Sequence, residues 1–400
     1  MDAIAIAGAS LAGIRAARTL REEGFGGRLS LIGDEPHLPY NRPPLSKEML
    51  ADEWDEERIL LEPRSAIDGL DVDLRLGIAA TELDLPRKSV ALSDGSRLDF
   101  DGLVIATGAR PRQLPGTSGM RGIFALRTLD DARELRAALR HHPGRVVVVG
   151  AGFIGAEVAS SARQLGLDVT VLEFAPIPFE NALGARMGTV LADLQRGYGI
   201  DLRTGVGVAG VDGLDRVERV QLTDGGTLDA ELLVVGIGVV PNTEWLVGSG
   251  LTIDNGVVCD ATCLAAPGVV AAGDIARWPN PAFDDELMRV EHWDNANEQG
   301  VHAAKTLLRG PEGAEPYAPI PWFWSDQCDS TIQMAGRPRR DDKTQVISGT
   351  VGDGKFAVIY GRGDRVVAVF GVNEPRQVIR FRRLIAQATS WSDALAVAGE

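Results

Sequence analysis

The sequence predicts an α/β fold, because strands, glycine-rich turns and helical segments alternate along most of its 400 residues. A strand–turn–helix–strand unit occurs twice, over residues 3–35 and again over residues 145–173. From about Pro319 the composition changes, and a strand pair joined by a short turn replaces the alternation. Together these observations predict two Rossmann-like dinucleotide-binding domains and a C-terminal α+β domain.

The first unit reads AIAIAGASLAGIRAARTLREEGFGGRLSLIGDE. Its strand runs into the turn Gly8-Ala9-Ser10-Leu11-Ala12-Gly13 and then into a helix, whose positive end would face a pyrophosphate. Ser10 stands where a second glycine is usual, so it restricts the approach of a phosphate but offers a hydroxyl donor. Asp34 and Glu35 end the next strand, where a carboxylate can bind a ribose hydroxyl. A structural βαβ unit without a ligand is the alternative.

The second unit reads RVVVVGAGFIGAEVASSARQLGLDVTVLE and has the complete glycine pattern. Gly150, Gly152 and Gly155 allow a tight turn, close approach of a pyrophosphate and close packing of helix on strand. Glu173 ends the following strand, 23 residues after Gly150. A carboxylate there accepts from a ribose 2′-hydroxyl and repels a 2′-phosphate, which favours NADH over NADPH. A turn kept only for packing is the alternative.

Two such units predict two nucleotides in one chain. The simplest pair is a flavin dinucleotide on the first and a nicotinamide on the second. Hydride passes between them only where the two rings meet, so the two nucleotide domains are expected to face each other. Reduced flavin can then release electrons singly, which a nicotinamide does not do easily.

The intervening segments follow the same alternation. Pro36–Lys47 is rich in Pro and Arg, which predicts an extended loop. Buried strands are expected within Leu103–Gly116, Leu232–Asn242 and Gly268–Ala276. Lys355–Val372 is typical of an antiparallel hairpin, with Arg362-Gly363-Asp364 as its turn rather than an adhesion motif, and a helix is expected beyond Arg376.

Composition narrows the choice of partners. The net charge is −15, from 41 basic and 56 acidic residues, so nucleic acid is not expected as a bulk partner. No apolar run reaches the ~18 residues of a membrane span, and no membrane association is expected. The first strand is expected to begin next to Met1, so no signal peptide is expected. With three cysteines in the chain, a cytoplasmic location is expected.

Six blocks occur in an order that resembles one family. They are PYNRPPLSKEML (Pro39–Leu50), LVIATGARPR (Leu103–Arg112), VVGAGFIGAEVA (Val148–Ala159), GVVAAGDIA (Gly268–Ala276), EHWDNANEQG (Glu291–Gly300) and PWFWSDQ (Pro321–Gln327). Together they resemble the NADH-dependent ferredoxin reductases of bacterial oxygenase systems, the putidaredoxin reductase type of the glutathione reductase superfamily. The resemblance extends from the first strand to about Phe370.

The resemblance implies a tightly but non-covalently bound FAD, with NADH as electron donor. Its FAD-site residues are Gly8, Ser10, Leu11, Ala12, Gly13, Asp34, Glu35, Arg42, Lys47, Ala80, Ala106, Thr107, Gly108, Arg127, Gly273, Asp274, Glu291 and Trp293. Its NAD-site and further cofactor-lining residues are Gly150, Gly152, Phe153, Ile154, Gly155, Glu157, Glu173, Gly236 and Gly238. Lys47 beside the flavin and Glu157 near the nicotinamide are the residues expected to act in catalysis.

Some residues of these blocks have simpler interpretations. Lys47 could be a solvated loop cation and Glu157 a surface acid. Trp322 and Trp324 could be packing residues on one strand face. The chain also departs from the family pattern at Ser10, at Cys328, where Tyr is usual, and in the segment after Phe370.

The cysteine pattern argues against a dithiol step. Disulfide reductases of this superfamily place two cysteines beside the flavin, but Cys259, Cys263 and Cys328 lie late in the chain and none falls in Pro39–Leu50. Cys259 and Cys263 are expected to be small buried residues, with a metal or a labile disulfide as the alternative. No His or Cys cluster has metal-ligand spacing, so no metal is expected.

The expected domains are an FAD domain over residues 1–112 and 241–318, an NAD domain over 113–240, and the C-terminal domain over 319–400. The expected function is electron transfer from NADH through FAD to a small acidic iron–sulfur ferredoxin that feeds an oxygenase, by a monomer or weak dimer. Residues 319–400 hold 11 basic and 9 acidic residues, so a basic docking surface is expected there, with a merely solvated face as the alternative. The rival functions are an NADH oxidase and a redox-responsive binding protein like apoptosis-inducing factor.

Overall fold

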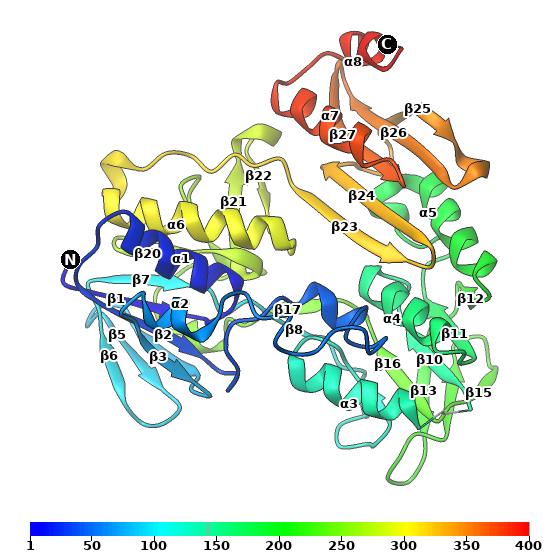
Figure 1. Cartoon of the computed structure of the whole chain (residues 1–400), viewed down its shortest axis with the longest axis horizontal. Helices are drawn as coiled ribbons and strands as arrows, with labels where there is room; N and C mark the ends of the chain where they lie inside the picture. Colours follow the sequence, from blue (N-terminus) through cyan, green and yellow to red (C-terminus); the bar gives the residue numbers. More distant parts are fainter. Residues whose placement is uncertain (142–143, 400) are drawn as a thin grey trace. The chain divides into compact units, whose positions relative to one another are not determined.

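The computed structural model describes residues 1–141 and 144–399. The chain forms two compact units, and each is assembled from three separate segments (Figure 1). Unit 1 comprises Met1–Asn41, Ile59–Arg110 and Val240–Pro321. Unit 2 comprises Arg42–Arg58, Pro111–Val239 and Trp322–Glu400. The chain therefore passes repeatedly from one unit to the other.

Unit 1 is built on a six-stranded sheet of order β19-β20-β7-β1-β2-β3. The first strand, β1, is buried and pairs in parallel with β2 on one side and β7 on the other. This sheet confirms the first predicted βαβ unit. Its strands are β1 (Ala3–Ala7), β2 (Arg28–Gly33), β3 (Asp73–Leu76), β7 (Gly102–Ile105), β19 (Leu264–Ala266) and β20 (Val269–Ala271).

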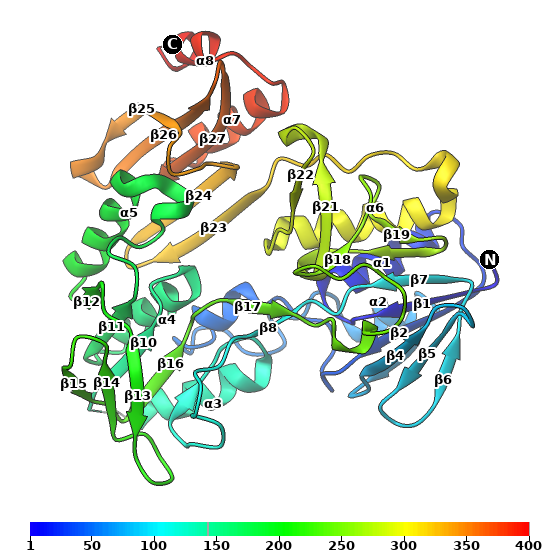
Figure 2. The same ribbon diagram turned by 180° about the vertical axis from the view of Figure 1, so that it is seen from behind.

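Two long helices of unit 1, α1 (Leu11–Glu22) and α6 (Trp293–Gly313), lie side by side (Figures 1 and 2). A Cβ at Gly300 would lie 2.4 Å from the carbonyl oxygen of Ala12, so the two backbones are in direct contact. The remaining elements of this unit are α2 (Arg64–Asp68), β4 (Ala80–Asp84), β5 (Ser89–Leu92), β6 (Arg97–Asp99), η2 (Glu244–Leu246), β18 (Val257–Val258), η3 (Gly273–Ile275), β21 (Ala276–Asn280), η4 (Pro281–Phe283) and β22 (Glu286–Met288).

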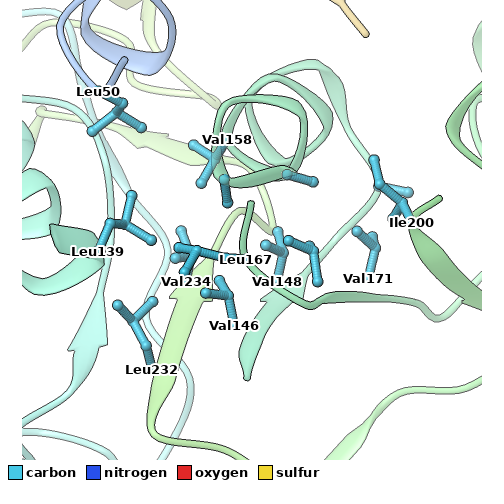
Figure 3. Packing of buried hydrophobic residues seen from close by; sticks show 14 of the residues in the cluster. Leu50, Leu139, Val146, Val148, Val158, Leu167, Val171, Ile200, Leu232 and Val234 are labelled. Carbon is cyan, nitrogen blue, oxygen red and sulfur yellow. The ribbon is translucent and has the colours of Figure 1, made fainter. Parts of the chain in front are cut away.

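Unit 2 contains a five-stranded parallel sheet of order β12-β11-β10-β16-β9. Its strands and helices are β9 (Ile123–Phe124), α3 (Leu129–Arg140), β10 (Val146–Val149), α4 (Phe153–Gln164), β11 (Val169–Glu173), α5 (Glu180–Gly197), β12 (Asp201–Thr204) and β16 (Leu232–Val235). Figure 3 shows its core, where Val146, Val148 and Val234 pack with Val158 of α4. A small sheet of β13 (Val208–Asp212), β14 (Arg219–Leu222) and β15 (Thr227–Asp229) follows β12 in the chain.

The C-terminal part of unit 2 is an antiparallel sheet of order β23-β24-β27-β26-β25. Its elements are β23 (Trp322–Gln327), β24 (Ser330–Gly336), β25 (Lys343–Thr350), η5 (Val351–Asp353), β26 (Lys355–Arg362), β27 (Arg365–Val372), α7 (Pro375–Ala386) and α8 (Trp391–Ala398). The predicted hairpin is confirmed, with Gly363 and Asp364 between its strands. The α/β class with a C-terminal α+β part is thus confirmed.

The Pro-rich loop differs from expectation, because Pro43–Ser46 forms a short 3₁₀ helix, η1, rather than extended chain. Leu50, a few residues later, packs into the unit 2 core beside Val158 (Figure 3). The two strands not yet described, β8 (Ala109–Pro111) and β17 (Val239–Pro241), pair with each other. Over residues 1–141 and 144–399, no helix has the length and apolar character needed to cross a bilayer.

Candidate dinucleotide sites and the Lys47–Glu157 pair

The glycine-rich turn of unit 1 joins β1 to α1 with very close backbone contacts. Gly8 has a φ of +122°, and a Cβ there would lie 2.1 Å from the carbonyl oxygen of Ala106. A Cβ at Gly13 would lie 1.8 Å from the carbonyl oxygen of Gly8. Both positions therefore require glycine. Ser10 caps the helix in an extended conformation and makes no side-chain capping hydrogen bond, so the start of α1 can receive an anion.

The two acids after β2 have different surroundings. Asp34 is exposed, while the carboxylate of Glu35 accepts a hydrogen bond from the hydroxyl of Tyr40. Asp34 is therefore the better placed of the two to accept from a ribose. The backbone N–H of Ile78 donates to Gly33 (2.8 Å), so the segment that leads to Ala80 runs beside the end of β2.

The carboxyl ends of β7 and β20 bring further predicted residues toward the same turn, because these strands follow β1 in the sheet. The backbone of Ala106 and Thr107 lies directly against Gly8, and Gly108 has a φ of +64°. A Cβ at Gly273 would lie 3.2 Å from that of Ala12. Asp274 follows and is 9% exposed. The structure thus gathers Gly8–Gly13, Ala106–Gly108 and Gly273–Asp274 at one sheet edge.

Two buried amides of α6 in this unit were not predicted. The side-chain oxygen of Gln299 accepts from the N–H of Gly273 (2.9 Å) and from Nδ2 of Asn295 (3.2 Å). Gln299 is fully buried and also donates to Sγ of Cys263 (3.4 Å). The block EHWDNANEQG contained both residues, but only the fold shows that they hold the Gly273 turn. In the same block, Trp293 Nε1 donates to Asn41 (3.0 Å), and Glu291 pairs with Arg289 (2.7 Å).

The turn of unit 2 has the same construction. A Cβ at Gly150 would lie 2.3 Å from the carbonyl oxygen of Gly236, and one at Gly155 would lie 2.1 Å from that of Gly150. At Gly152 the nearest atom would be 4.0 Å away. Nothing in the protein requires glycine at that position, so the open space before α4 fits a bound pyrophosphate. Gly238, with a φ of +92°, follows Gly236 by two residues.

The first two residues of α4 point in different directions. The ring of Phe153 lies 4.5 Å from those of both Phe179 and Phe323, centroid to centroid, so it is part of the packing. The side chain of Ile154 is 48% exposed.

Glu173 is held rigidly at the end of β11. Its Oε2 accepts from the N–H of Ala151 in the glycine-rich turn (2.8 Å), and its Oε1 accepts from the N–H of Ala175 (2.8 Å). The carboxylate therefore lies beside the turn with lone pairs left over, and these can accept from ribose hydroxyls.

Lys47 and Glu157 form a largely buried ion pair in unit 2. Lys47 Nζ lies 3.4 Å from Oε1 of Glu157 and 3.7 Å from Oδ2 of Asp326. Glu157 is 4% exposed. Ser325 donates to its Oε1 (2.6 Å), and Ser46 donates to its Oε2. The alternatives of a solvated Lys47 and a surface Glu157 are therefore wrong.

Burial raises the pKa of the Glu157 carboxyl above its ordinary value, although Lys47 and the two serine hydroxyls oppose this effect. The sequence did not indicate Ser46, Ser325 or Asp326 as partners. They come from η1 and β23, and only tertiary structure brings both to α4.

An aromatic pair extends this cluster along β23. The rings of Trp322 and Trp324 stack with centroids 5.3 Å apart. Lys47 Nζ lies 5.9 Å from the Trp324 ring, and the guanidinium of Arg382 lies 5.9 Å from the Trp322 ring. Both tryptophans are partly exposed, so they are not simply core residues.

Arg42 and Arg127, two predicted FAD-site residues, lie together in unit 2. Nη1 of Arg42 donates to the carbonyl oxygen of Arg127 (2.6 Å). Arg127 in turn is followed by the capping box of α3, in which Thr128 and Asp131 exchange hydrogen bonds. The capping box therefore holds the backbone next to Arg127 in place.

The cysteines form no disulfide in this structure, and Cys328 is partly exposed. All three are free, and Cys259 and Cys263 are buried, as predicted. Burial raises the pKa of Cys259 and of Cys328 to about 12, and that of Cys263 well above its ordinary value. Among residues 1–141 and 144–399, no group of three or more His, Cys, Asp or Glu side chains could hold a metal ion.

Two glycine-rich turns at the carboxyl ends of parallel strands, one in each unit, define a dinucleotide-dependent oxidoreductase with two nucleotide sites. Residues 2–300 match the family of pyridine nucleotide-disulphide oxidoreductases, and residues 322–398 match the reductase C-terminal family. The chain belongs to the pyridine nucleotide-disulphide oxidoreductases, among the ferredoxin reductases of the putidaredoxin reductase type.

Its relatives cover nearly the whole chain. Rhodocoxin reductase of Rhodococcus erythropolis is 38% identical over 96% of this chain and 89% of its own length. Putidaredoxin reductase CamA of Pseudomonas putida is 36% identical over 96% of this chain and 92% of its own. The crystal structure of the covalent putidaredoxin reductase–putidaredoxin complex matches with a TM-score of 0.91 and 36% identity, covering 97% of this chain and 93% of that chain.

Proposed function

We propose that this protein is an NADH:ferredoxin oxidoreductase that uses FAD to deliver electrons to a small iron–sulfur ferredoxin serving an oxygenase. The observation that supports the proposal is the presence of two dinucleotide turns in one chain. The relatives support the acceptor, since they include reductase components of the chlorobenzene and p-cumate dioxygenase systems. The family and these relatives also confirm FAD and NADH as the expected cofactor and donor.

The turn of unit 1 fits FAD. Gly8 and Gly13 keep the backbone clear beside the start of α1, where a pyrophosphate would bind. Asp34 would accept from the adenosine ribose and Asp274 from the ribityl chain. We propose that the other FAD-site residues identified by resemblance also contact FAD. FAD held there would supply the acceptance of a hydride equivalent from NADH and the release of electrons one at a time.

Lys47 and Glu157 would act at the flavin. A positive charge from Lys47 would stabilise negative charge on the reduced ring. The buried Glu157 carboxyl, bound by Ser46 and Ser325, would keep the Lys47 ammonium group in place. Lys47 is thus proposed as a catalytic residue, and Glu157 as an acid that contacts the nicotinamide.

We further propose the division into an FAD domain (1–112 and 241–318), an NAD domain (113–240) and a C-terminal domain (319–400). Three free cysteines support a cytoplasmic location. The exposed charges of the chain support a monomer or weak dimer.

The test is NADH-dependent reduction of cytochrome c, measured with and without candidate ferredoxins from the same genome. A ferredoxin that accelerates the reaction at least tenfold is the expected result. Rapid flavin reduction with no acceleration by any ferredoxin, and fast oxygen consumption, would indicate an NADH oxidase. A long-lived charge-transfer complex in air without ferredoxin activity would indicate a redox-responsive binding protein.

A further inference from the structure

Phe174 is an exposed aromatic residue at a position where a ligand is expected. It follows Glu173 at the carboxyl end of β11, and its side chain is 77% exposed. Ile154 and Ile237, at 48% and 36% exposed, follow the neighbouring strands β10 and β16. All three residues thus follow strands at the carboxyl edge of the sheet, where parallel α/β sheets bind their ligands. A single exposed phenylalanine would need no explanation, but this location gives it one.

The protein supports one edge of the Phe174 ring. A Cβ at Gly207 would lie 3.0 Å from Cδ2 and 3.8 Å from Cε2 of the ring. Gly207 is itself fixed, because its N–H donates to Oγ1 of Thr223 (2.9 Å) and its carbonyl oxygen accepts from the N–H of Thr223 (3.0 Å). The ring therefore rests on a rigid backbone while most of its surface remains open.

The geometry points to Phe174 as the stacking platform for the adenine ring of NADH. Glu173 is anchored by the N–H groups of Ala151 and Ala175 and is available to the adenosine ribose. Adenine is bonded to that same ribose, so the base must lie close to Glu173. An aromatic face one residue further along binds a purine by stacking. This inference rests on the proposed NADH site.

A platform for adenine contributes to binding but not to chemistry. The stacked base lies far from the reacting end of NADH, so its contact is equal in the ground state and the transition state. Removing the ring should raise the KM for NADH and leave the limiting rate of flavin reduction unchanged. A reduced nicotinamide mononucleotide, which lacks adenine, should react equally well with and without the ring.

The experiment compares FAD-loaded wild type with Phe174→Ala, Phe174→Tyr and a matched control, Leu214→Ala, which removes another highly exposed apolar side chain (98%) of unit 2. The dissociation constant of ADP-ribose is measured by calorimetry. We expect Phe174→Ala to raise this dissociation constant about 5- to 30-fold. Phe174→Tyr should keep it near the wild-type value, and Leu214→Ala should leave it unchanged.

Gly207→Ala tests the support of the ring. Its added methyl group should displace Phe174 and weaken ADP-ribose binding in the wild-type background, but not in the Phe174→Ala background. Unchanged ADP-ribose binding in Phe174→Ala would overturn the inference while leaving NADH as donor. A wild type that neither binds ADP-ribose nor is reduced by NADH would overturn both the inference and the proposed function.

Discussion

The ammonium group of Lys47 lies 3.4 Å from the carboxylate of Glu157, although the two residues are 110 positions apart in the chain. Each belongs to a block that the sequence singled out, Lys47 to the Pro-rich loop and Glu157 to the helix after the second glycine turn. Leu50 and η1 pack the loop against α4 and so make the pair possible. The side chains of Lys47 and Glu157 are only 12% and 5% exposed.

The first prediction concerns pH and Glu157. Its pKa is raised in the folded protein, so its contribution to stability is fully present below about 4.5, the value of a free Glu, and is lost as the pH rises through the folded pKa. Relative to Glu157→Gln, the wild type should lose unfolding free energy above that pH, by at most about 1.4 kcal/mol per pH unit. Urea titrations of both holoproteins measure the difference.

Glu53→Gln is the matched control for this experiment, because Glu53 is exposed. It should show no such pH dependence. A wild-type advantage that grows with pH would contradict the prediction, since it would mean that Lys47 and the two serines outweigh burial.

The second prediction concerns coenzyme choice. Glu173 is fixed beside the turn and would meet the 2′-phosphate of NADPH with like charge. We expect NADH to be preferred by roughly 30- to 1000-fold in kcat/KM, equivalent to about 2–4 kcal/mol. Glu173→Gln keeps a side-chain oxygen that can accept from the ribose but removes the negative charge. The variant should therefore show a smaller preference for NADH over NADPH. Equal efficiency of the two coenzymes with the wild type would show that another residue sets the choice.

The third prediction concerns Asp274. Its side chain is 9% exposed beside the Gly273 turn, which Gln299 holds. Asp274→Ala should yield mostly apoprotein with an intact far-UV spectrum, since it removes a proposed ribityl contact without opening a core. Asp254→Ala, which only breaks an exposed pair with Arg277, is the control. Flavin absorbance per protein gives the result, and a normal flavin content in Asp274→Ala would rule out a principal contact.

The fourth prediction concerns the thiols. Their raised pKa values leave almost no thiolate at neutral pH, and the thiolate is the reactive form. Replacing Cys259, Cys263 and Cys328 by Ser together should keep NADH–ferricyanide turnover within about threefold, since no step needs a thiol. Loss of turnover in a folded variant that retains FAD would reveal a redox sulfur.

The fifth prediction concerns the acceptor. Helix α7 carries Arg376, Arg380, Arg382 and Arg383 in a chain of net charge −15, and Arg382 lies over Trp322. If an acidic ferredoxin binds there, Arg380→Glu and Arg383→Glu should raise its KM severalfold at low salt and leave the KM for NADH unchanged.

Salt provides a second readout for this surface. The ferredoxin-dependent rate should fall steeply toward 1 M salt, where the Debye length is about 3 Å, while the ferricyanide rate should not follow. Arg216→Glu, an equal charge change on an exposed residue outside the C-terminal part, is the control. Unaltered ferredoxin kinetics in both α7 variants would place docking elsewhere.

The glycine turns could be predicted because their requirements are local. Strand, glycine spacing and acidic strand end lie within about 30 residues, and helix and strand periods are visible over that distance. The environment of Glu157 could not be predicted. Ser325 follows it by 168 residues, and nothing in either segment indicates that α4 and β23 touch. Gln299 was missed for the same reason, because its partner Gly273 lies on a different element.

Short elements also escaped prediction. β9 has only two residues, Ile123 and Phe124, too few to show alternation. η1 begins at Pro43, whose fixed φ also suits extended chain, so the Pro-rich composition suggested a loop.

The interrupted chain path has a consequence for synthesis. The unit 2 parallel sheet is complete once residue 235 has emerged, since β9, β10, β11, β12 and β16 lie in one uninterrupted stretch. The unit 1 sheet begins with the third residue but lacks β20 until residue 271, and α6, which covers α1, ends at residue 313. On the ribosome, the N-terminal glycine turn must therefore wait for Gly273, which is made much later, whereas the backbone that Gly150 contacts is complete with Gly236. Of these two sheets, the one whose first strand is made first is therefore the one that is completed second.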